Sequence, residues 1–337
     1  MDSSMYPQGS GGLKSRYVDG VLVFSNSSGG EVYRIDPSSK LVTFQSIAVS
    51  SAGKTYYVDP QNGASTNDGL SWTKAFAAFS SLDSILGHGD TIMFRGAFKG
   101  NWSAPYKNDI TLIGCANTPR QATDGGVSNG AGATWLSADS PVAAPLLSIR
   151  KQAWRVENIF FNNADTAYPC VYLLRDNETP EADASHALIQ GCVFTGTDNG
   201  ILMSGGNNFV RILGNVFRDF AGSGDIALTT AVGAGAGSAV QCEIGYNLFH
   251  GNVHNIIVGL GAGSRIHHNF LCVVGNTVTS TSVVNLTGST SVTVDNNVIP
   301  RTSVTAGNDT LFVDGTTCLW VANQMANEVR YLKPDES

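Results

Sequence analysis

Apolar and polar positions alternate along the chain in short segments that share one pattern. Segments 210–217 (VRILGNVF), 242–249 (CEIGYNLF), 264–271 (SRIHHNFL) and 292–299 (VTVDNNVI) each carry an apolar residue three positions before an Asn and another two positions after it. Alternation over so few residues is typical of β-strands, in which successive side chains point to opposite faces. The pattern therefore predicts a short strand that recurs along the chain.

The repeat extends further when these segments are aligned on their Asn. The anchor positions are Asn158, Asn215, Asn247, Asn269 and Asn297, and Cys192 takes the same place in one further repeat. The apolar column three residues earlier holds Ile189, Ile212, Ile244, Ile266 and Val294, and the column two residues later holds Phe160, Phe194, Phe217, Phe249, Leu271 and Ile299. Stacked coils would bring equivalent residues together at about 4.8 Å and form a continuous apolar core.

Repeats of about 22 to 34 residues that contain several short strands predict an all-β fold, a parallel β-helix. We expect the right-handed form, because parallel crossovers are right-handed in the great majority of sheets. Asn tolerates a left-handed backbone, and its amide can bond to the backbone and to the Asn of the next coil. The Asn column is therefore interpreted as a structural ladder at a corner of the coils.

A second column predicts ion pairs on the outer surface. Arg211, Glu243 and Arg265 each lie four residues before an anchor, in three successive repeats. If the alignment holds, they stack as a ladder of alternating charge. Exposed ion pairs contribute at most about 1 kcal/mol each, so we interpret this ladder as support for the register.

The segment before the coils predicts an N-terminal cap. Ser71 would begin an α-helix over roughly 73–86 that covers the open end of the core. One face of this helix would carry Phe76, Phe79, Leu82 and Leu86.

Three stretches carry a resemblance to a known family. They are YYVDP…NDG.SW..AF (56–76), GDTI.F.G.F (89–98) and the Asn-anchored coils. Together, over roughly residues 54–320, they resemble the pectin-lyase-like right-handed β-helix superfamily, which includes many bacteriophage tailspikes. The superfamily contains lyases, hydrolases, epimerases and non-enzymatic virion parts, so the resemblance implies a fold and leaves the function open.

The first residues form a separate segment, and we divide the chain into an N-terminal strand-rich anchoring segment (1–52) and a β-helix with its caps (53–337). Short strands are expected at VLVF, EVYRI and LVTF between Gly/Ser and Asp-Pro turns within 17–44. This stretch is similar to N-terminal segments of phage structural proteins.

Composition narrows the possible partners. Charged residues make up 14% of the chain and the net charge is −7, so no basic surface for nucleic acid is expected. No apolar run is long enough to predict a membrane span, and no secretion signal begins the sequence. The six cysteines are scattered, which favours free buried thiols over disulfides or zinc and indicates a reducing cytoplasm. We expect no cofactor and no metal.

Candidate catalytic residues are few. Asp219 and Asp225 flank a glycine-rich corner, DFAGSGD, and with Asp198 from the previous coil would form a carboxylate pair. The alternative is that all three are turn residues, which Asp favours. His267 and His268, as neighbours on a strand, are expected on opposite faces, while His250 and His254 with His268 leave a zinc site open as an alternative.

Exposed aromatic rings would offer faces for sugars to stack on. The eligible residues are Trp102, Tyr106, Trp135, Trp154 and Tyr246, of which Trp154 and Tyr246 are predicted to point outward. The alternative for each ring is a place in the core or in a subunit contact.

Three hypotheses for function follow. The first is a non-enzymatic virion structural protein of a tailed phage, a capsid decoration (cement) protein in preference to a tail spike, assembled in the host cytoplasm. Its partners would be the major capsid protein or tail subunits and further copies of itself, with a trimer implied by the resemblance. The alternatives are a tailspike depolymerase (polysaccharide lyase or glycoside hydrolase) and an adhesin that binds a host glycan.

Overall fold

The computed structural model divides the chain into two compact units, Met1–Gly53 and Lys54–Ser337, where the sequence predicted segments 1–52 and 53–337. The structure describes residues 14–18, 21–25, 31–36, 41–44, 53–115, 132–140, 142–164, 168–176, 182–197, 199–204, 206–220, 226–231, 239–250, 255–258, 260–271, 284–286, 289–299, 312–313 and 317–325.

The smaller unit contains a four-stranded antiparallel sheet in the order β1-β2-β3-β4. The strands are β1 (Lys14–Val18), β2 (Val21–Ser25), β3 (Glu31–Asp36) and β4 (Leu41–Phe44). The sequence predicted the last three strands and missed β1. Val18 pairs with Val21 across the Asp-Gly sequence that separates β1 from β2, a spacing typical of a two-residue hairpin.

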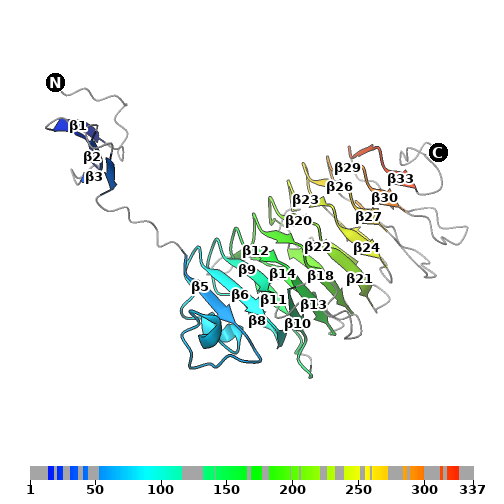
Figure 1. Cartoon of the computed structure of the whole chain (residues 1–337). Helices are drawn as coiled ribbons and strands as arrows, with labels where there is room; N and C mark the ends of the chain where they lie inside the picture. Colours follow the sequence, from blue (N-terminus) through cyan, green and yellow to red (C-terminus); the bar gives the residue numbers. More distant parts are fainter. Residues whose placement is uncertain are drawn as a thin grey trace, which may run out of the picture. The chain divides into compact units, whose positions relative to one another are not determined.

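The larger unit is a parallel β-helix of three sheets (Figure 1). The first sheet contains β5 (Thr55–Val58), β6 (Thr91–Arg95), β9 (Thr111–Cys115), β12 (Arg155–Glu157), β17 (Leu188–Gln190), β20 (Arg211–Leu213), β23 (Glu243–Gly245), β26 (Arg265–His267), β29 (Thr293–Asp295) and β32 (Leu319–Val321). The second contains β7 (Ala97–Lys99), β10 (Ala133–Leu136), β13 (Ile159–Asn163), β18 (Val193–Gly196), β21 (Val216–Phe220), β24 (Leu248–His250), β27 (Phe270–Leu271), β30 (Val298–Ile299) and β33 (Gln324–Met325). The third contains β8 (Trp102–Ser103), β11 (Leu147–Ile149), β14 (Val171–Leu173), β19 (Ile201–Ser204), β22 (Ile226–Ala231), β25 (Asn255–Val258), β28 (Val284–Asn285) and β31 (Phe312–Val313).

Successive coils add one strand to each sheet in turn, and the strands within each sheet pair in parallel. This arrangement confirms the predicted parallel β-helix; its right-handed sense stays a prediction. A short antiparallel pair, β15 (Arg175–Asp176) and β16 (Ala182–Asp183), lies between β14 and β17. The described helices are two 3-10 turns, so none has the length and apolar character needed to cross a bilayer.

Like side chains stack inside the coils, as the repeat requires. Ile189, Ile212, Ile244, Ile266 and Val294 are fully buried in register on the first sheet. A column of rings on the second sheet runs through Phe79, Trp135, Phe161, Phe194, Phe217 and Phe249, with neighbouring centroids 4.4 to 5.7 Å apart. Phe79, which precedes the coils, therefore continues their core toward the N-terminal end.

The Asn ladder runs through the corner between the first and second sheets. Asn247 shows the pattern: its Nδ2 donates to Ile212 O (2.9 Å) and Asn269 Oδ1 (3.0 Å). Its Oδ1 accepts from the backbone N (2.9 Å) and Nδ2 (3.1 Å) of Asn215. Every donor and acceptor of the buried amide is thus satisfied. The same contacts continue through Asn297 to Asn323, a member that the sequence alignment did not include.

The alignment was wrong by one residue in the coil of β12 and β13. Phe161, rather than Phe160, pairs with Phe194, and Phe160 pairs with Val193 in a small cluster on the outer face. Asn158 therefore lies one position before the ladder, where its φ is 59° and its Nδ2 donates to Gly114 O (2.7 Å). Asn suits a left-handed position as well as the ladder, so residue type alone did not separate the two.

The predicted α-helical cap was also wrong. Residues Trp72–Lys74 (η1) and Phe79–Leu82 (η2) form 3-10 turns, and Phe76 between them forms a parallel bridge with Val58. Hydrogen bonds from Phe76 N to Tyr57 O (2.9 Å) and from Asp59 N to Phe76 O (2.8 Å) hold this segment extended against β5. The apolar face was real, since Phe76, Phe79, Leu82 and Leu86 are 4% exposed or less. Pairing with the exposed edge of β5 took precedence over helix formation.

Candidate functional site

The corner between the first and second sheets contains one left-handed residue per coil. From the coil of β12 onward these residues are Asn158, Gly191, Gly214, Tyr246, His268, Asn296 and Ala322, with φ between 51° and 62°. Gly and Asn adopt this conformation at little cost, whereas a bulky side chain there is strained. Strained residues are concentrated at functional sites. Tyr246 and His268 therefore mark this part of the corner as a candidate site.

An open hollow of about 410 Å³ lies beside this corner. Its lining residues are Glu157, Asn158, Gln190, Gly191, Leu213, Gly214 and Tyr246. By their order along the axis, Asn158 and Tyr246 form the two ends and the glycines lie between them. A Cβ built on Gly214 meets no atom within 4 Å, so the space above this glycine is open. The hollow exists because two successive coils have no side chain at the corner.

Tyr246 forms one end of the hollow and is the exposed ring among the predicted sugar-binding candidates. Its side chain is 62% exposed, and its ring stacks on His268 with centroids 5.1 Å apart and planes inclined by 24°. His267 meets the same ring edge-on at 5.2 Å. An aromatic face beside amide and carboxylate groups can hold the apolar face of a sugar while the polar groups bond to its hydroxyls.

The tryptophans among those candidates lie in the core. Trp102, Trp135 and Trp154 are 4% exposed or less. The prediction that Trp154 points outward was wrong: its ring packs against Trp102, and its Nε1 donates to Lys107 O (2.7 Å). Tyr106 is half-buried, with the Arg150 guanidinium over its ring at 5.5 Å.

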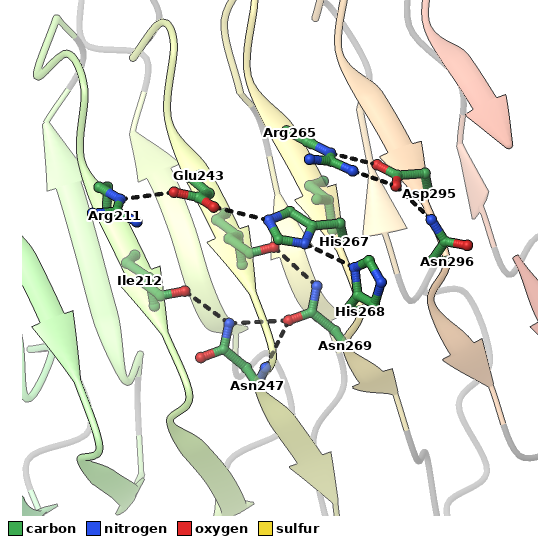
Figure 2. A network of polar contacts seen from close by, with 12 residues as sticks. Arg211, Ile212, Glu243, Asn247, Arg265, His267, His268, Asn269, Asp295 and Asn296 are labelled. Carbon is green, nitrogen blue, oxygen red and sulfur yellow. Dashed lines mark hydrogen bonds and ion pairs between the residues drawn. The ribbon is translucent and has the colours of Figure 1, made fainter. Parts of the chain in front are cut away.

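A polar network crosses β20, β23, β26 and β29 of the first sheet (Figure 2). Its two histidines contact Tyr246. Arg211 Nε bonds to Glu243 Oε2 (2.7 Å), as the predicted ladder of charges requires. Arg265 is in register with Glu243, yet it bonds to both oxygens of Asp295 in the following coil (2.8 and 2.7 Å). The other oxygen of Glu243 is taken by His267 Nε2 (3.1 Å). The three charges therefore divide between two neighbouring groups instead of forming one ladder.

The network lowers the pKa of both carboxylic acids. Burial would raise the pKa of Glu243, but hydrogen bonds from Arg211 and His267 outweigh it. The hydrogen bonds from Arg265 lower the pKa of Asp295 against a smaller opposing effect of burial. Both groups are therefore ionised at neutral pH.

His267 is nearly buried although it belongs to the outer face of β26, with 2% of its surface exposed. The residue beside it in β23 is Gly245, where a Cβ would lie 2.6 Å from the imidazole Cε1. The absence of a side chain at Gly245 thus lets the ring lie flat across the sheet and reach Glu243.

The two adjacent histidines contact each other, contrary to the expectation that they point to opposite faces. His267 Nδ1 and His268 Nδ1 are 3.0 Å apart. β26 ends at His267, and His268 has a φ of 51° that breaks the alternation of the strand. Within the residues that the structure describes, no group of three or more His, Cys, Asp or Glu side chains could hold a metal. His254 of the alternative zinc site lies outside those residues, as does the side chain of His250.

The predicted catalytic carboxylates fall outside what the structure describes. Asp198 and Asp225 are not among the described residues, and Asp219 lies in β21 with its side chain outside them. Their convergence stays a prediction. Among the lining residues of the hollow, Glu157 is the carboxylate, and Arg155 bonds to it at 3.0 Å.

Comparison with known proteins gave structural matches and no sequence match. No family model and no curated protein matched the chain. Among solved structures, the pectate lyase Pel9A is 14% identical with a TM-score of 0.43, over 82% of this chain and 78% of that one. PfbA, a surface adhesin of Streptococcus pneumoniae, is 10% identical with a TM-score of 0.46, over 82% and 70%.

A third match is the lacto-N-biosidase of Eubacterium ramulus, 10% identical with a TM-score of 0.35, over 81% of this chain and 68% of that one. At such identities and TM-scores these structures assign no residue and no activity to the chain. Its fold is established by its own strand pairing.

Proposed function

We propose that the chain is a non-enzymatic structural protein of a tailed-phage particle, whose β-helix offers a carbohydrate-binding corner. The observation that supports carbohydrate binding is the strained, exposed Tyr246 at the end of an open hollow. Asn158, Gln190 and Glu157 are among the residues that line the same hollow. This combination of ring face and polar groups suits a sugar ring with its hydroxyls.

The proposed place in a particle is supported by the division of the chain. A small antiparallel sheet in residues 1–53 forms a unit separate from the β-helix, and its sequence is similar to N-terminal segments of phage structural proteins. We propose that this unit anchors the protein to the major capsid protein or to tail subunits, with capsid decoration as the preferred location and a homotrimer as the assembly. Mass spectrometry of virions purified from the host should detect the chain. Virions that lack the chain would refute this role.

The carbohydrate-binding role is tested on an array of bacterial surface glycans. The full chain should bind a defined set of them, and Tyr246→Ala should lose that binding while retaining the wild-type unfolding midpoint. Phe209→Ala is a matched control, because Phe209 is another exposed ring with a left-handed backbone, at a different corner. Equal binding by Tyr246→Ala and the wild type would exclude the hollow as the site.

Incubation of the chain with the same glycans distinguishes binding from enzymatic cleavage. A tailspike depolymerase would release reducing ends or unsaturated uronates from the bound glycan, and Asp198→Asn, Asp219→Asn or Asp225→Asn would stop that release. The proposal expects the glycan to be recovered intact.

A further inference from the structure

The contacts of the two adjacent histidines determine where their protons lie. Glu243 is ionised and can only accept, so His267 Nε2, 3.1 Å from its Oε1, must carry a proton. In a neutral His267, Nδ1 then has a lone pair and accepts from His268 Nδ1 at 3.0 Å. His268 therefore carries its proton on Nδ1. Its Nε2 therefore carries a lone pair, and the side chain is exposed.

One further proton fits this chain of hydrogen bonds without breaking it. On His268 Nε2, it leaves the Nδ1–H bond to His267 and the Nε2–H bond to Glu243 intact. A second added proton would place hydrogens on both Nδ1 atoms, which are 3.0 Å apart. The hydrogen-bond geometry of the pair therefore accommodates a single added proton.

The other charges around the pair are already balanced. Arg211 from β20 is bonded to Glu243 from β23, and Arg265 from β26 is bonded to Asp295 from β29. The added proton therefore changes the local charge from zero to +1, and it does so beside Tyr246, whose ring stacks on His268 at 5.1 Å. A cation against the face of a tyrosine attracts it.

We propose that Glu243, His267 and His268 form a proton-sensitive relay that fixes Tyr246 as the end wall of the hollow, so that a glycan binds there more tightly below neutral pH. This inference rests on the carbohydrate-binding role proposed above. A ring held in place before binding requires less ordering when the ligand arrives. From the strength of exposed cation–π contacts, affinity should rise about two- to fivefold between pH 7.5 and 5.5.

A second histidine serves as an internal control. His186 also has a left-handed backbone and stacks on an exposed ring, Phe209, with centroids 4.7 Å apart. Within the described part of the chain, its ring has no hydrogen-bond partner. It therefore shares the ring contact and lacks the connection to a carboxylate.

The first arm of the test needs no ligand. Nitrogen-15 NMR of the histidine rings in the full chain at pH 7.5, assigned with His186→Asn and His268→Asn, should show the Nδ1–H tautomer at His268 and the Nε2–H tautomer at His267. His186 should show the tautomer mixture of an exposed imidazole. A protonated Nε2 on neutral His268 would overturn the proposal.

The second arm compares glycan-array binding at pH 7.5 and 5.5. The wild type and His186→Asn should bind more tightly at pH 5.5, and His268→Asn should bind equally at both values; Asn is chosen because Asn296 has the same backbone conformation. Wild-type binding that does not change with pH would overturn the relay and leave the carbohydrate-binding role standing. A chain that binds no glycan at either pH would remove that role and this inference together.

Discussion

Two columns of residues run one position apart through the same corner of the β-helix, and they differ in burial and in how far the residue type varies from coil to coil. The inner column holds Asn in five successive coils, after Cys192 in the coil before them; Asn215, Asn247, Asn269, Asn297 and Asn323 are each 2% exposed or less. The outer column changes from coil to coil, with Asn158, Gly191, Gly214, Tyr246 and His268 in successive positions. Within this run each Asn amide bonds to the amide of the next coil.

The outer positions share only a left-handed backbone, so each can vary alone. Where the column holds Gly, a hollow opens, and where it holds Tyr and His, an exposed aromatic wall and a titratable network arise. The repeated Asn of the inner column therefore reflects structure, while the exposed ring of Tyr246 beside the hollow marks the candidate site. Four experiments probe that distinction.

The largest effect is expected in the inner column. Asn247→Ala removes the acceptor of Asn215 N and of one hydrogen of Asn215 Nδ2, and it removes a donor to Ile212 O. At about 1–2 kcal/mol for each of these two buried donors, the free energy of unfolding should fall by about 2–4 kcal/mol in urea titration. The matched outer variant, Asn296→Ala, should cost less than about 1 kcal/mol, because Ala322 already has this backbone conformation. Equal losses in the two variants would contradict the distinction.

The next effect concerns the space that His267 needs. Gly245→Ala places a Cβ 2.6 Å from the imidazole and should displace it from Glu243. Overpacking of this kind costs about 1–3 kcal/mol in the free energy of unfolding. Gly214→Asn, at an open outer position, is the control and should leave stability near that of the wild type. An unchanged His267 NMR signal in Gly245→Ala would show that the ring does not depend on this glycine.

A smaller effect is expected when the strained tyrosine is replaced by the residue its backbone favours. In Tyr246→Gly, relief of strain offsets the lost ring contacts, so the free energy of unfolding should stay within about 1 kcal/mol of the wild type. Glycan binding should nevertheless fall at least tenfold. A large loss of stability without loss of binding would assign Tyr246 a structural role.

The smallest effect is on the pH dependence of the unfolding free energy, to which the ion pairs of Glu243 and Asp295 contribute. Glu243 and Asp295 have lowered pKa values in the folded protein, so they stabilise it above their unfolded values of about 4.3 and 3.9. This contribution is lost as the pH falls through the lowered folded values. Unfolding free energy should therefore decline less below pH 4 in the double variant Glu243→Gln, Asp295→Asn. Asn247→Ala should decline as steeply as the wild type, because the inner ladder has no ionisable group.

The fold could be predicted from the sequence because stacked coils require similar residues at equivalent positions. The Ile and Asn columns could be recognised in the sequence for this reason. The error at Asn158 arose because two adjacent corner positions both accept Asn. The helical cap failed because a 3.6-residue apolar period did not reveal that Phe76 would pair with the exposed edge of β5.

Only part of the candidate site could be predicted from the sequence. Tyr246 stood out as a ring outside the core pattern, whereas the hollow depends on Gly191 and Gly214 lying side by side in space. The contact between His267 and His268 depends on a left-handed residue at the end of β26 and on the glycine beside His267 in the preceding coil. The available signal in the sequence was Gly245 itself. A glycine just before the corner leaves space for a side chain of the neighbouring coil, here His267, to cross the strand.

Binding of bacterial surface glycans by Gly214→Asn tests the account most directly. The open space above Gly214 would accept the new side chain, and Asn158 and Asn296 show that Asn suits this backbone. We predict that affinity falls at least tenfold while the unfolding midpoint stays at the wild-type value. Undiminished binding by Gly214→Asn would contradict the claim that the hollow beside Tyr246 is the ligand site.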